Sequence, residues 1–396
     1  MNITRSIATL ALTAMTIMPG AGSLFATAED LPATIRIATY NTSLYGKKAG
    51  EVRDRLATGT FRQAEKIASI VQTVRPDILL LNEIDHDADG ETVTLMAEKY
   101  LAVGQDDLRP IDYPFRYSAP SNTGIRSGMD LDSDGSTSGP ADAFGFGLYP
   151  GQYSMAVLSR FPIDADNIRT FQKLLWKSMP GALRPIDPKS KESYYDDATW
   201  DSLRLSSKNH IDVPVRIGNH VIHVLACHPT PPVFDGPEDR NGCRNHDEIR
   251  FWNEYTRNPT AEFLVDDQSR PGGLATDALF FIAGDLNSDP KDGDSRFDAI
   301  ETLLTNPLLS DPKPSSPGGR EAAGGYQSGK RKGDPSLDTA KFGRSGNMRI
   351  DYVLPSSRLA VKRAEVFWPT KGTAESKWIS ASDHRLVWAE VELPSE

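Results

Sequence analysis

The chain has 396 residues, 38% of them hydrophobic, and a formal net charge of −10 at pH 7. A chain of this length and hydrophobic content can bury a large core, which is typical of a globular protein. An evenly acidic surface repels a phosphodiester polymer, so the charge argues against tight, nonspecific binding of nucleic acid.

The N-terminus predicts export. Arg5 supplies a positive charge, residues 7–18 are apolar and uncharged, and Ala26 and Ala28 place small residues before Glu29. This order is that of a secretory signal peptide with cleavage after Ala28, so we expect a secreted or periplasmic protein. The apolar run is shorter than the roughly 20 residues of a membrane span, and no later segment resembles one. The alternative is a buried N-terminal helix.

The start of the mature chain predicts a strand, a helix and a second strand. Residues 34–40 alternate apolar and polar side chains, which indicates a strand that ends at Asn41. Residues 61–74 carry apolar side chains at helical spacing. Residues 77–81 form a short apolar run, typical of a strand buried on both faces, and the run ends just before Glu83.

Long segments without clear periodicity separate the later elements. Residues 102–150 are rich in Gly, Asp, Ser and Pro, residues 162–208 are mixed, and residues 310–346 are rich in Gly, Ser and Lys. We interpret all three as surface insertions in one domain over 29–396, which follows a signal peptide over 1–28.

The remaining strands are predicted by short apolar runs. Residues 211–215 and 221–227 flank Gly218-Asn219, which indicates a β-hairpin. A helix is expected to begin at Asn245. The other runs that predict strands are residues 155–159, 278–283, 349–354, 361–367 and 386–393.

Polar residues capable of chemistry recur where these strands end. In a layered sheet protein the strand ends converge on one rim, and ligand sites are built there. The residues at or beside strand ends are Asn41, Glu83, His228, Asp285, Asn287, Asp351, Asp383 and His384.

The carboxylates of this set predict a hard divalent cation. Mg²⁺ prefers one or two carboxylates together with waters and phosphate oxygens, and no His and Cys spacing of a zinc site is present. Each residue alone has a plain structural alternative, because an Asp after a strand usually caps a turn or a helix. The joint occurrence of Glu83, Asp285, Asp351 and Asp383 at strand ends favours a site.

Six short motifs occur at these strand ends in a characteristic order. They are Tyr40-Asn41, Asn82-Glu83, His228-Pro229, Gly284-Asp285-Leu286-Asn287, Arg349-Ile350-Asp351-Tyr352 and Ser382-Asp383-His384. The chain thereby resembles the endonuclease/exonuclease/phosphatase superfamily over residues 35–393. That superfamily includes the DNase I-like nucleases, the abasic-site endonucleases, the neutral sphingomyelinases and the inositol polyphosphate 5-phosphatases. Asn82 departs from the pattern, because many members carry Gln before the Glu.

The resemblance implies an α/β fold, a four-layer α/β/β/α sandwich in which two facing mixed sheets are flanked by helices. It implies that Glu83 is the main metal ligand, with Asn41 beside it and Asp383 as a further candidate ligand. Asp285 is then expected to orient or activate the attacking water, and Asn287 to hold the phosphate. The implied cofactor is Mg²⁺ or Mn²⁺.

The resemblance also implies a pair of histidines at the phosphate. Asp383 is expected to pair with His384, with Asp351 as a neighbour, and His228 is expected to be the second histidine of the DNase-like branch. A cation at Glu83 would neutralise the phosphodiester and stabilise the leaving oxygen. His384 would supply a positive charge or a proton.

The long loop contains the first half of a calcium-binding sequence. Asp130, Asp132 and Asp134 have the required spacing, but Ala141 stands where the twelfth, acidic residue is expected. A structural Ca²⁺ and a solvated acidic turn are both open interpretations.

Further polar residues lie near the predicted rim. Asn122, Gln152 and Tyr153 bracket the long loop and could contact substrate, although turn chemistry and packing explain them equally well. Arg244 and Arg250 could bind anions. For Asn245, which is also a candidate there, helix capping is the plain alternative.

The two cysteines predict a disulfide. Cys227 and Cys243 are the only cysteines of a chain expected in an oxidising compartment. The alternative is two separate free thiols.

Three functions are compatible with this sequence. The leading hypothesis is a metal-dependent phosphodiesterase acting on DNA or RNA, the second a phosphatase or phospholipase C-type enzyme acting on small phosphate esters or lipid head groups, and the third a catalytically silent binding module. A monomer is expected. A nuclease needs basic residues beside its site, and those available are Arg320, Lys330, Arg331, Lys332, Lys341 and Arg344.

Overall fold

The computed structural model describes residues 32–323, 331–343 and 346–395. The expected signal peptide over 1–28 and its cleavage site after Ala28 lie outside this part of the chain. Within the described part, no helix combines the length and the apolar character needed to cross a membrane.

Six strands form the first sheet, in the order β12-β13-β1-β2-β4-β3. Only β1 and β2 are parallel, and the other neighbours pair antiparallel. The strands are β1 (Thr34–Leu44), β2 (Ile78–Ile84), β3 (Phe115–Ala119), β4 (Ser154–Ser159), β12 (Ala360–Val366) and β13 (Val387–Glu392).

Five strands form the second sheet, in the order β11-β8-β7-β6-β5. Here only β7 and β8 are parallel. A separate hairpin pairs β9 (Ala340–Phe342) with β10 (Gly346–Met348). The strands of the sheet are β5 (Arg169–Thr170), β6 (His210–Ile217), β7 (His220–Cys227), β8 (Leu279–Asp285) and β11 (Asp351–Pro355).

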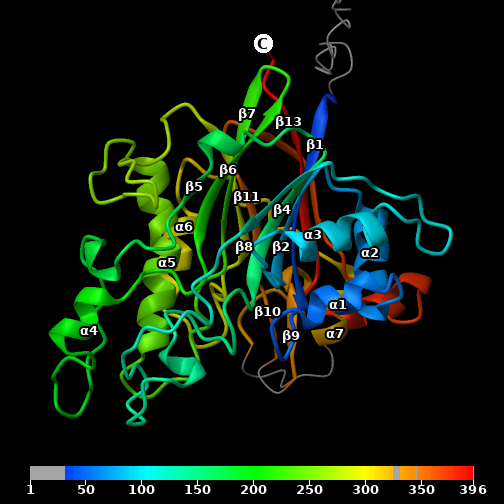
Figure 1. Cartoon of the computed structure of the whole chain (residues 1–396). Helices are drawn as coiled ribbons and strands as arrows, with labels where there is room; N and C mark the ends of the chain where they lie inside the picture. Colours follow the sequence, from blue (N-terminus) through cyan, green and yellow to red (C-terminus); the bar gives the residue numbers. More distant parts are fainter. Residues whose placement is uncertain (1–31, 324–330, 344–345, 396) are drawn as a thin grey trace, which may run out of the picture.

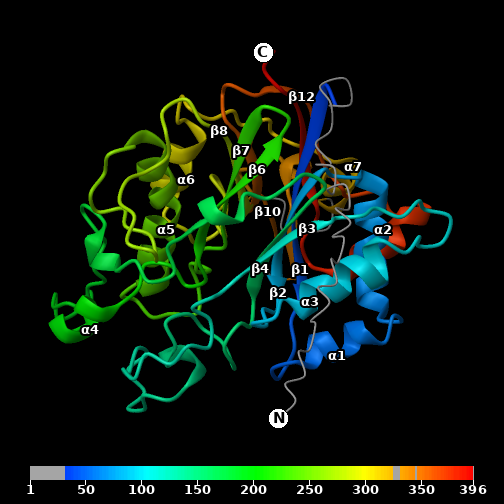
Figure 2. The same cartoon turned by 45° about the horizontal axis from the view of Figure 1, so that its top comes forward.

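Helices cover the outer face of each sheet (Figures 1 and 2). The first sheet is flanked by α1 (Glu51–Ala57), α2 (Arg62–Val74), α3 (Glu91–Met96), the π-helix Ala97–Leu101 and the 3₁₀-helix Ala374–Ala381. The second sheet is flanked by α5 (Arg240–Arg257) and α6 (Phe297–Leu304). Two shorter helices are α4 (Asp197–Ser202) and α7 (Pro317–Ala322).

Three buried hydrophobic clusters separate these layers. Along β2, Leu79 and Leu81 pack into the cluster shared with α2, whereas Ile78 and Leu80 pack into the cluster between the two sheets. A third cluster joins the second sheet to α5. Because successive strand residues point to opposite faces, a strand buried on both faces is apolar throughout. The predicted four-layer sandwich is therefore confirmed.

Some elements differ from the sequence prediction. The segment 102–150 contains β3, and α5 begins at Arg240 rather than at Asn245. The first turn of α5 contains Gly242 and few apolar side chains, so it carries little helical periodicity. Its position is set instead by packing of the later turns against the second sheet.

The predicted disulfide is wrong, because Cys227 and Cys243 are both free and buried. The thiol of Cys227 accepts a hydrogen bond from Trp252 Nε1 at 2.9 Å. Trp252 lies nine residues beyond Cys243 on α5, so Cys227 faces a different turn of the helix. Burial raises the pKa of Cys243 to about 11 and raises that of Cys227 further, so both thiols stay protonated at neutral pH.

Candidate active site

The polar residues at the strand ends converge where the two sheets meet. Asn41 of β1 donates from Nδ2 to Asp285 Oδ2 of β8 at 3.0 Å, which joins the first sheet to the second. His228 Nε2 lies 3.4 Å from Asp285 Oδ2 and 3.9 Å from Glu83 Oε1. Side chains from both sheets therefore surround one small volume.

His384 is held by Asp351. Its Nδ1 lies 2.9 Å and 3.1 Å from the two carboxylate oxygens of Asp351, which is fully buried and also accepts from Thr339 Oγ1 at 2.7 Å. Burial alone would lower the pKa of His384, but the charges of Asp351 and Asp285 outweigh it and raise this pKa to about 10. These two carboxylates therefore favour the protonated form of His384 at neutral pH.

Asp383 lies at the limit of ion-pair distance from His384, and the closer carboxylate is that of Asp351. Asp383 Oδ1 lies 4.0 Å from His384 Nε2, and its side chain is 50% exposed. Asp383 instead accepts from Ser43 Oγ at 2.9 Å. Neighbouring residues of an extended segment point to opposite sides, so an Asp directly before a His is poorly placed to hold its ring. The orienting carboxylate comes from β11, 33 positions earlier in the chain.

Glu83 projects from a β-bulge. The register of β2 shifts between Asn82 and Ile84 against both neighbouring strands, and Glu83 itself has a left-handed φ of 54°. A bulge re-aims one side chain at the cost of local backbone strain. The Glu83 side chain is 20% exposed, and the protein around it raises its pKa by desolvation.

Asp285 lies directly opposite Asp351 across the β8–β11 pair, so both carboxylates share one face of the sheet. Asp285 Oδ1 accepts from the Asn287 amide at 2.9 Å, and burial raises its pKa. The preceding Gly284 has a φ of 143°, and a Cβ there would lie 2.0 Å from the Cys227 carbonyl. Glycine thus lets β8 approach β7 closely enough to place Asp285 beside His228.

The loops after β7 and β8 are tied together beside His228. Asn287 Nδ2 donates to the Pro229 carbonyl at 3.1 Å, and Asn245 Nδ2 donates to the carbonyls of Thr230 and Leu286. His228 Nδ1 has no hydrogen-bond partner in the described part of the chain. Burial, with the positive charges of Lys208 and His384, lowers the pKa of His228 well below its usual value. His228 is therefore neutral, and its Nε2 faces the carboxylates.

Two predicted substrate contacts are structural instead. Asn122 is fully buried and donates to the carbonyls of Gln172 and Ser206, both at 2.7 Å. Gln152 is also buried, and its amide bonds the backbone of Leu148 and Gly46. Both amides close loops, and the two N–H groups of Asn122 are fully used by these carbonyls.

The three candidates on α5 are structural as well. Arg244 donates to the carbonyls of Leu205, Phe144 and Arg204, and Arg250 pairs with Asp247 at 3.0 Å. Asn245 lies inside the helix and caps nothing. These side chains satisfy buried backbone groups and a buried carboxylate, which is the usual fate of polar residues in a helix packed against a sheet.

Tyr153 borders the site together with a residue that the sequence analysis missed. Its ring centroid lies 4.5 Å from that of Tyr45, which is 41% exposed. Burial raises the pKa of both phenols, and the charge of Glu83 raises it further in both. The aromatic pair therefore stands close to Glu83.

The segment 310–346 also reaches the site. Phe342 packs edge-on against the His384 ring at a centroid distance of 5.4 Å, and the Lys341 amide donates to the Asp383 carbonyl. Of the other predicted basic residues, Arg331 pairs with Asp338. Lys330 and Arg344 lie outside the described residues. Neither Thr339 nor Phe342 belongs to a recognisable motif, so the sequence offered no local signal for them.

The acidic sequence in the long loop forms a cluster. Carboxylate oxygens of Asp130, Asp132 and Asp134 lie within 4.8 Å of one another, with Asp130 and Asp134 exposed. Asp130 already accepts from the amides of Asp134 and Gly135. The buried Asp142, one position after the expected twelfth ligand, instead accepts from Leu131 and Gly139 and closes the loop. The geometry is compatible with either interpretation of this loop.

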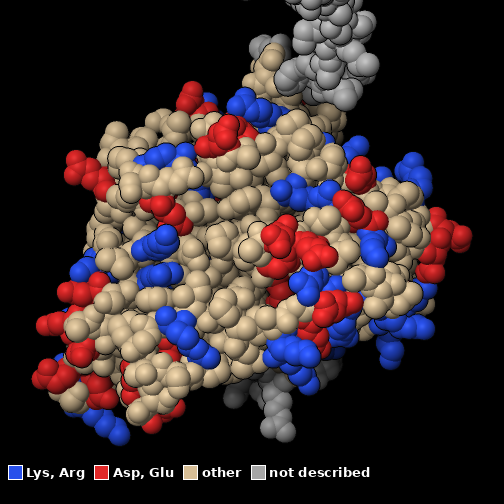
Figure 3. Space-filling model, viewed as in Figure 1, with Lys and Arg blue, Asp and Glu red and all other residues tan. Residues whose placement is uncertain are grey.

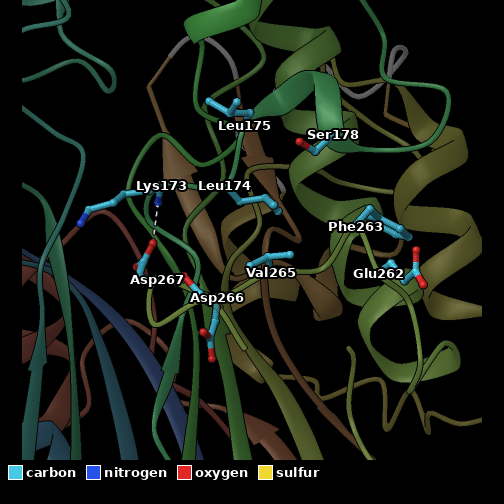
Figure 4. Close-up of a pocket in the computed structure, with 10 residues that line it drawn as sticks. Lys173, Leu174, Leu175, Ser178, Glu262, Phe263, Val265, Asp266 and Asp267 are labelled. Atoms are coloured by element: carbon cyan, nitrogen blue, oxygen red, sulfur yellow. Dashed lines mark hydrogen bonds between the residues drawn. The ribbon is translucent and has the colours of Figure 1, made fainter. Parts of the chain in front are cut away.

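A cavity of about 630 Å³ lies away from these residues (Figure 4). Its lining includes Asp266 and Asp267, whose carboxylates are occupied: Asp266 pairs with Arg169 and Arg270, and Asp267 accepts from backbone amides that include that of Lys173. None of the predicted site residues lines it. The volume of a cavity therefore does not locate the candidate active site in this molecule.

The donor set at the rim fits a divalent cation. Ligand atoms of Asp285, Asp351 and His384 lie within 4.8 Å of one another and could hold a metal. Glu83 faces the same volume, since its carboxylate lies 3.9 Å from the His228 ring that also meets Asp285. Several carboxylates close together repel one another, and a hard cation with oxygen ligands relieves that repulsion.

Comparison with known proteins identifies the class. Residues 38–384 match the model of the Endonuclease/Exonuclease/phosphatase family, so the chain belongs to this family. Members of the family are metal-dependent hydrolases of phosphate esters. A search of curated proteins finds no match.

The chain is also similar to several solved structures. An endonuclease/exonuclease/phosphatase from Beutenbergia cavernae is 18% identical, with a TM-score of 0.51 over 92% of this chain and 72% of that one. A family protein from Leptotrichia buccalis is 14% identical, with a TM-score of 0.46 over 91% and 100%. Sphingomyelinase C from Streptomyces griseocarneus is 15% identical, with a TM-score of 0.44 over 90% and 99%.

Proposed function

We propose that this protein is a divalent-metal-dependent phosphodiesterase. The observation that carries the proposal is the buried His384–Asp351 pair, which faces Asp285 from one side of the rim while Glu83 enters from the other. Hydrolysis of an anionic ester requires a positive charge, a proton acceptor and a metal ligand around one volume. His384, Asp285 and Glu83 can supply them in that order.

Each residue has a role in this proposal. Glu83, with Asn41 and Asp383 near it, would hold Mg²⁺ or Mn²⁺, which neutralises phosphate charge and stabilises the leaving oxygen. Burial raises the pKa of Asp285, so this carboxylate accepts a proton from water more readily than an ordinary Asp does. His384 places its positive charge at a phosphate oxygen.

Two further residues complete the contacts with the phosphate. His228, which is neutral, offers its Nε2 toward the same volume. Asn287 has a left-handed φ of 50° and is partly exposed, so its side chain borders the site while its amide orients Asp285. Hydrogen-bond donors fixed before the reaction stabilise charge in the transition state without reorganising.

A nucleic-acid substrate is favoured by the aromatic pair Tyr45 and Tyr153. An exposed aromatic ring beside a phosphate site can stack on a nucleobase, whatever the base sequence. The face in Figure 3 interleaves Lys and Arg with Asp and Glu rather than showing one continuous basic stripe. That mixture favours a short or single-stranded segment held at the site over a long duplex held by its backbone.

A lipid head group is the second candidate substrate. Phe146 and Leu148 are 59% and 48% exposed on the long loop, where apolar side chains could contact a lipid surface. The site also serves this reaction, because a phosphodiester joins a lipid to its head group. We further propose export of the protein, on the N-terminal pattern of charge, apolar run and small residues.

A substrate panel tests these proposals. Hydrolysis of bis-nitrophenyl phosphate, nitrophenyl phosphate, single-stranded and duplex DNA, and sphingomyelin is measured with Mg²⁺, Mn²⁺, Ca²⁺ or EDTA. The expected result is metal-dependent cleavage of the diesters, fastest on single-stranded DNA and abolished by EDTA. Faster cleavage of sphingomyelin selects the lipid substrate, and no cleavage of any substrate contradicts the proposed function.

A further inference from the structure

Lys208 lies beside the site on a segment that is fixed from two sides. β6 and β7 are antiparallel with His210 opposite Cys227, so continuing this register sets Lys208 alongside the His228-Pro229 turn. The Lys208 carbonyl accepts from the Asn122 amide at 2.9 Å. This bond comes from the backbone N–H of Asn122, while its buried side chain donates to the carbonyl of Ser206 in the same segment.

Glu248 on α5 fixes the same segment from the other side. Its Oε1 accepts from the backbone and the hydroxyl of Ser207, at 2.6 and 3.0 Å. Its Oε2 accepts from the Thr230 amide at 2.6 Å, just after the His228-Pro229 turn. Both carboxylate oxygens of Glu248 thus bond backbone or hydroxyl groups on either side of Lys208, and the two loops are held at a fixed spacing.

The ammonium of Lys208 has no partner in this arrangement. The residue is only 7% exposed, and among the described residues no side chain or carbonyl forms a hydrogen bond or a close ion pair with its Nζ. The charged groups that face it are Glu83, Asp285 and Glu248. Burial nevertheless lowers the pKa of Lys208. The stem of Lys208 is therefore buried, while its ammonium is not bonded to another described group and can bind an anion at the rim.

We propose that Lys208 contacts the substrate, donating from Nζ to a non-bridging oxygen of the phosphoryl group. This inference rests on the proposed function and adds a residue to it. The phosphate would lie beside Lys208 and His384, because the Lys208 segment runs alongside the His228-Pro229 turn, and the rings of His228 and His384 both face Asp285. A second cation suits this reaction, because a diester acquires a second negative charge on its non-bridging oxygens in the transition state.

The structural alternative makes Lys208 a counter-ion that only relieves repulsion between Glu83 and Asp285. The two interpretations differ in the sign of one measurable effect. A lysine that binds phosphate repels a divalent cation at Glu83, so its removal leaves metal binding unchanged or tighter. A lysine that holds the carboxylates in place is needed for the metal site, so its removal weakens metal binding.

The test compares the full-length wild-type chain with Lys208→Met, Lys208→Arg and the matched control Lys362→Met. Lys362 lies on the edge strand β12 and pairs with Glu392, so its loss should change none of these readouts. Calorimetry measures binding of inorganic phosphate in EDTA, and a separate titration measures binding of Mn²⁺. Circular dichroism and thermal melting establish that each variant folds.

For Lys208→Met we expect phosphate binding about 10- to 100-fold weaker than wild type, the usual effect of one charge-assisted hydrogen bond. Lys208→Arg should recover most of it, and Mn²⁺ binding should be equal or tighter. The value of kcat/KM for bis-nitrophenyl phosphate should fall about 100-fold. Unchanged phosphate binding in folded Lys208→Met, or loss of its Mn²⁺ binding, overturns the inference.

The two proposals fail separately. If the wild type cleaves no phosphodiester, the proposed function fails, while the phosphate titration in EDTA still reports on Lys208. If Lys208→Met cleaves as fast as wild type while Glu83→Gln is inactive, the function stands and the inference is wrong. If Lys208→Met does not fold, Lys208→Arg with an unaltered phosphate affinity and an unaltered kcat/KM supports the inference, and a loss of both contradicts it.

Discussion

The two sheets contribute to the rim in different ways. From the second sheet, the side chains of Asp285 and Asp351 are at most 2% exposed, and both are fixed by hydrogen bonds. On the side of the first sheet, the side chains of Glu83 and Asp383 are 20% and 50% exposed. Burial fixes charge and geometry, whereas exposure lets an ion and its waters exchange. The second sheet is thus suited to proton and charge positioning, and the first to metal binding.

His384 joins these two halves. It lies just before β13 of the first sheet, yet its ring is bound by Asp351 of the second. Its Nε2 lies 3.7 Å from Asp285 Oδ2. The catalytic geometry therefore exists only when the two sheets are packed together, and the cluster between the sheets is part of what positions the site.

The largest expected effect separates the two aspartates near His384. Asp351→Asn should lower kcat/KM by about 10⁴-fold, because an amide no longer stabilises the cationic ring or fixes its tautomer, as in other His–Asp pairs. Asp383→Asn should lower it only about 10-fold, because Asp383 does not hold the ring. Steady-state kinetics on bis-nitrophenyl phosphate, with thermal melting as the control for folding, measures both.

An equal loss in the two variants would contradict this assignment. A larger loss for Asp383→Asn would restore the pairing suggested by the adjacent positions of Asp383 and His384 in the sequence. No pH profile is needed for this distinction, because the ratio of the two kcat/KM values is sufficient.

The sequence predicted the layers and the rim for a physical reason. A strand buried on both faces must be apolar throughout, so the run over 77–81 was recognisable without knowledge of the strands and helices that pack on it. The polar residue that ends such a strand, Glu83, was equally visible. These features depend on short stretches of chain, and short stretches are what a sequence displays.

The pairings across the rim were not predictable in the same way. Asp351 and His384 are 33 positions apart, and their contact follows from the packing of one sheet on the other. The bonds that bury Asn122 and Gln152 likewise depend on loops that meet only in the folded chain. Lys208 carries no motif, although its place just before β6, which pairs with the strand that ends directly before His228, was a usable signal.

The next effect concerns the metal and the more exposed half of the rim. Glu83→Gln keeps the shape of the side chain but removes its charge, so Mn²⁺ should bind at least about 10-fold more weakly. Asp351→Asn should bind Mn²⁺ nearly as well as wild type, because Asp351 is committed to His384 and Thr339. Titration with Mn²⁺ under identical conditions compares the two. Equal weakening would place the metal at the buried Asp285–Asp351–His384 cluster instead.

The smallest effect contrasts two buried histidines. Asp351 and Asp285 raise the pKa of His384 to about 10, whereas burial lowers the pKa of His210 to about 4 even though Glu248 opposes it. His210 is bound by Ser206 and by the Glu248 carbonyl and packs against Phe251 and Trp252. It therefore remains neutral in the folded chain at a pH where the unfolded chain is protonated.

The sign of the pH dependence follows from this difference. Above pH 6.5, the ordinary value for histidine, both states leave His210 neutral and it contributes no pH dependence. As the pH falls from 6.5 toward 4, only the unfolded chain takes up the proton, so the free energy of unfolding decreases. His210→Gln should show a smaller decrease than wild type between pH 7 and pH 5 in urea denaturation with EDTA present. If the free energy of unfolding decreases equally in His210→Gln and wild type, His210 is already protonated in the folded chain. Its hydrogen bond to the Glu248 carbonyl would then stabilise the protonated ring against the cost of burial.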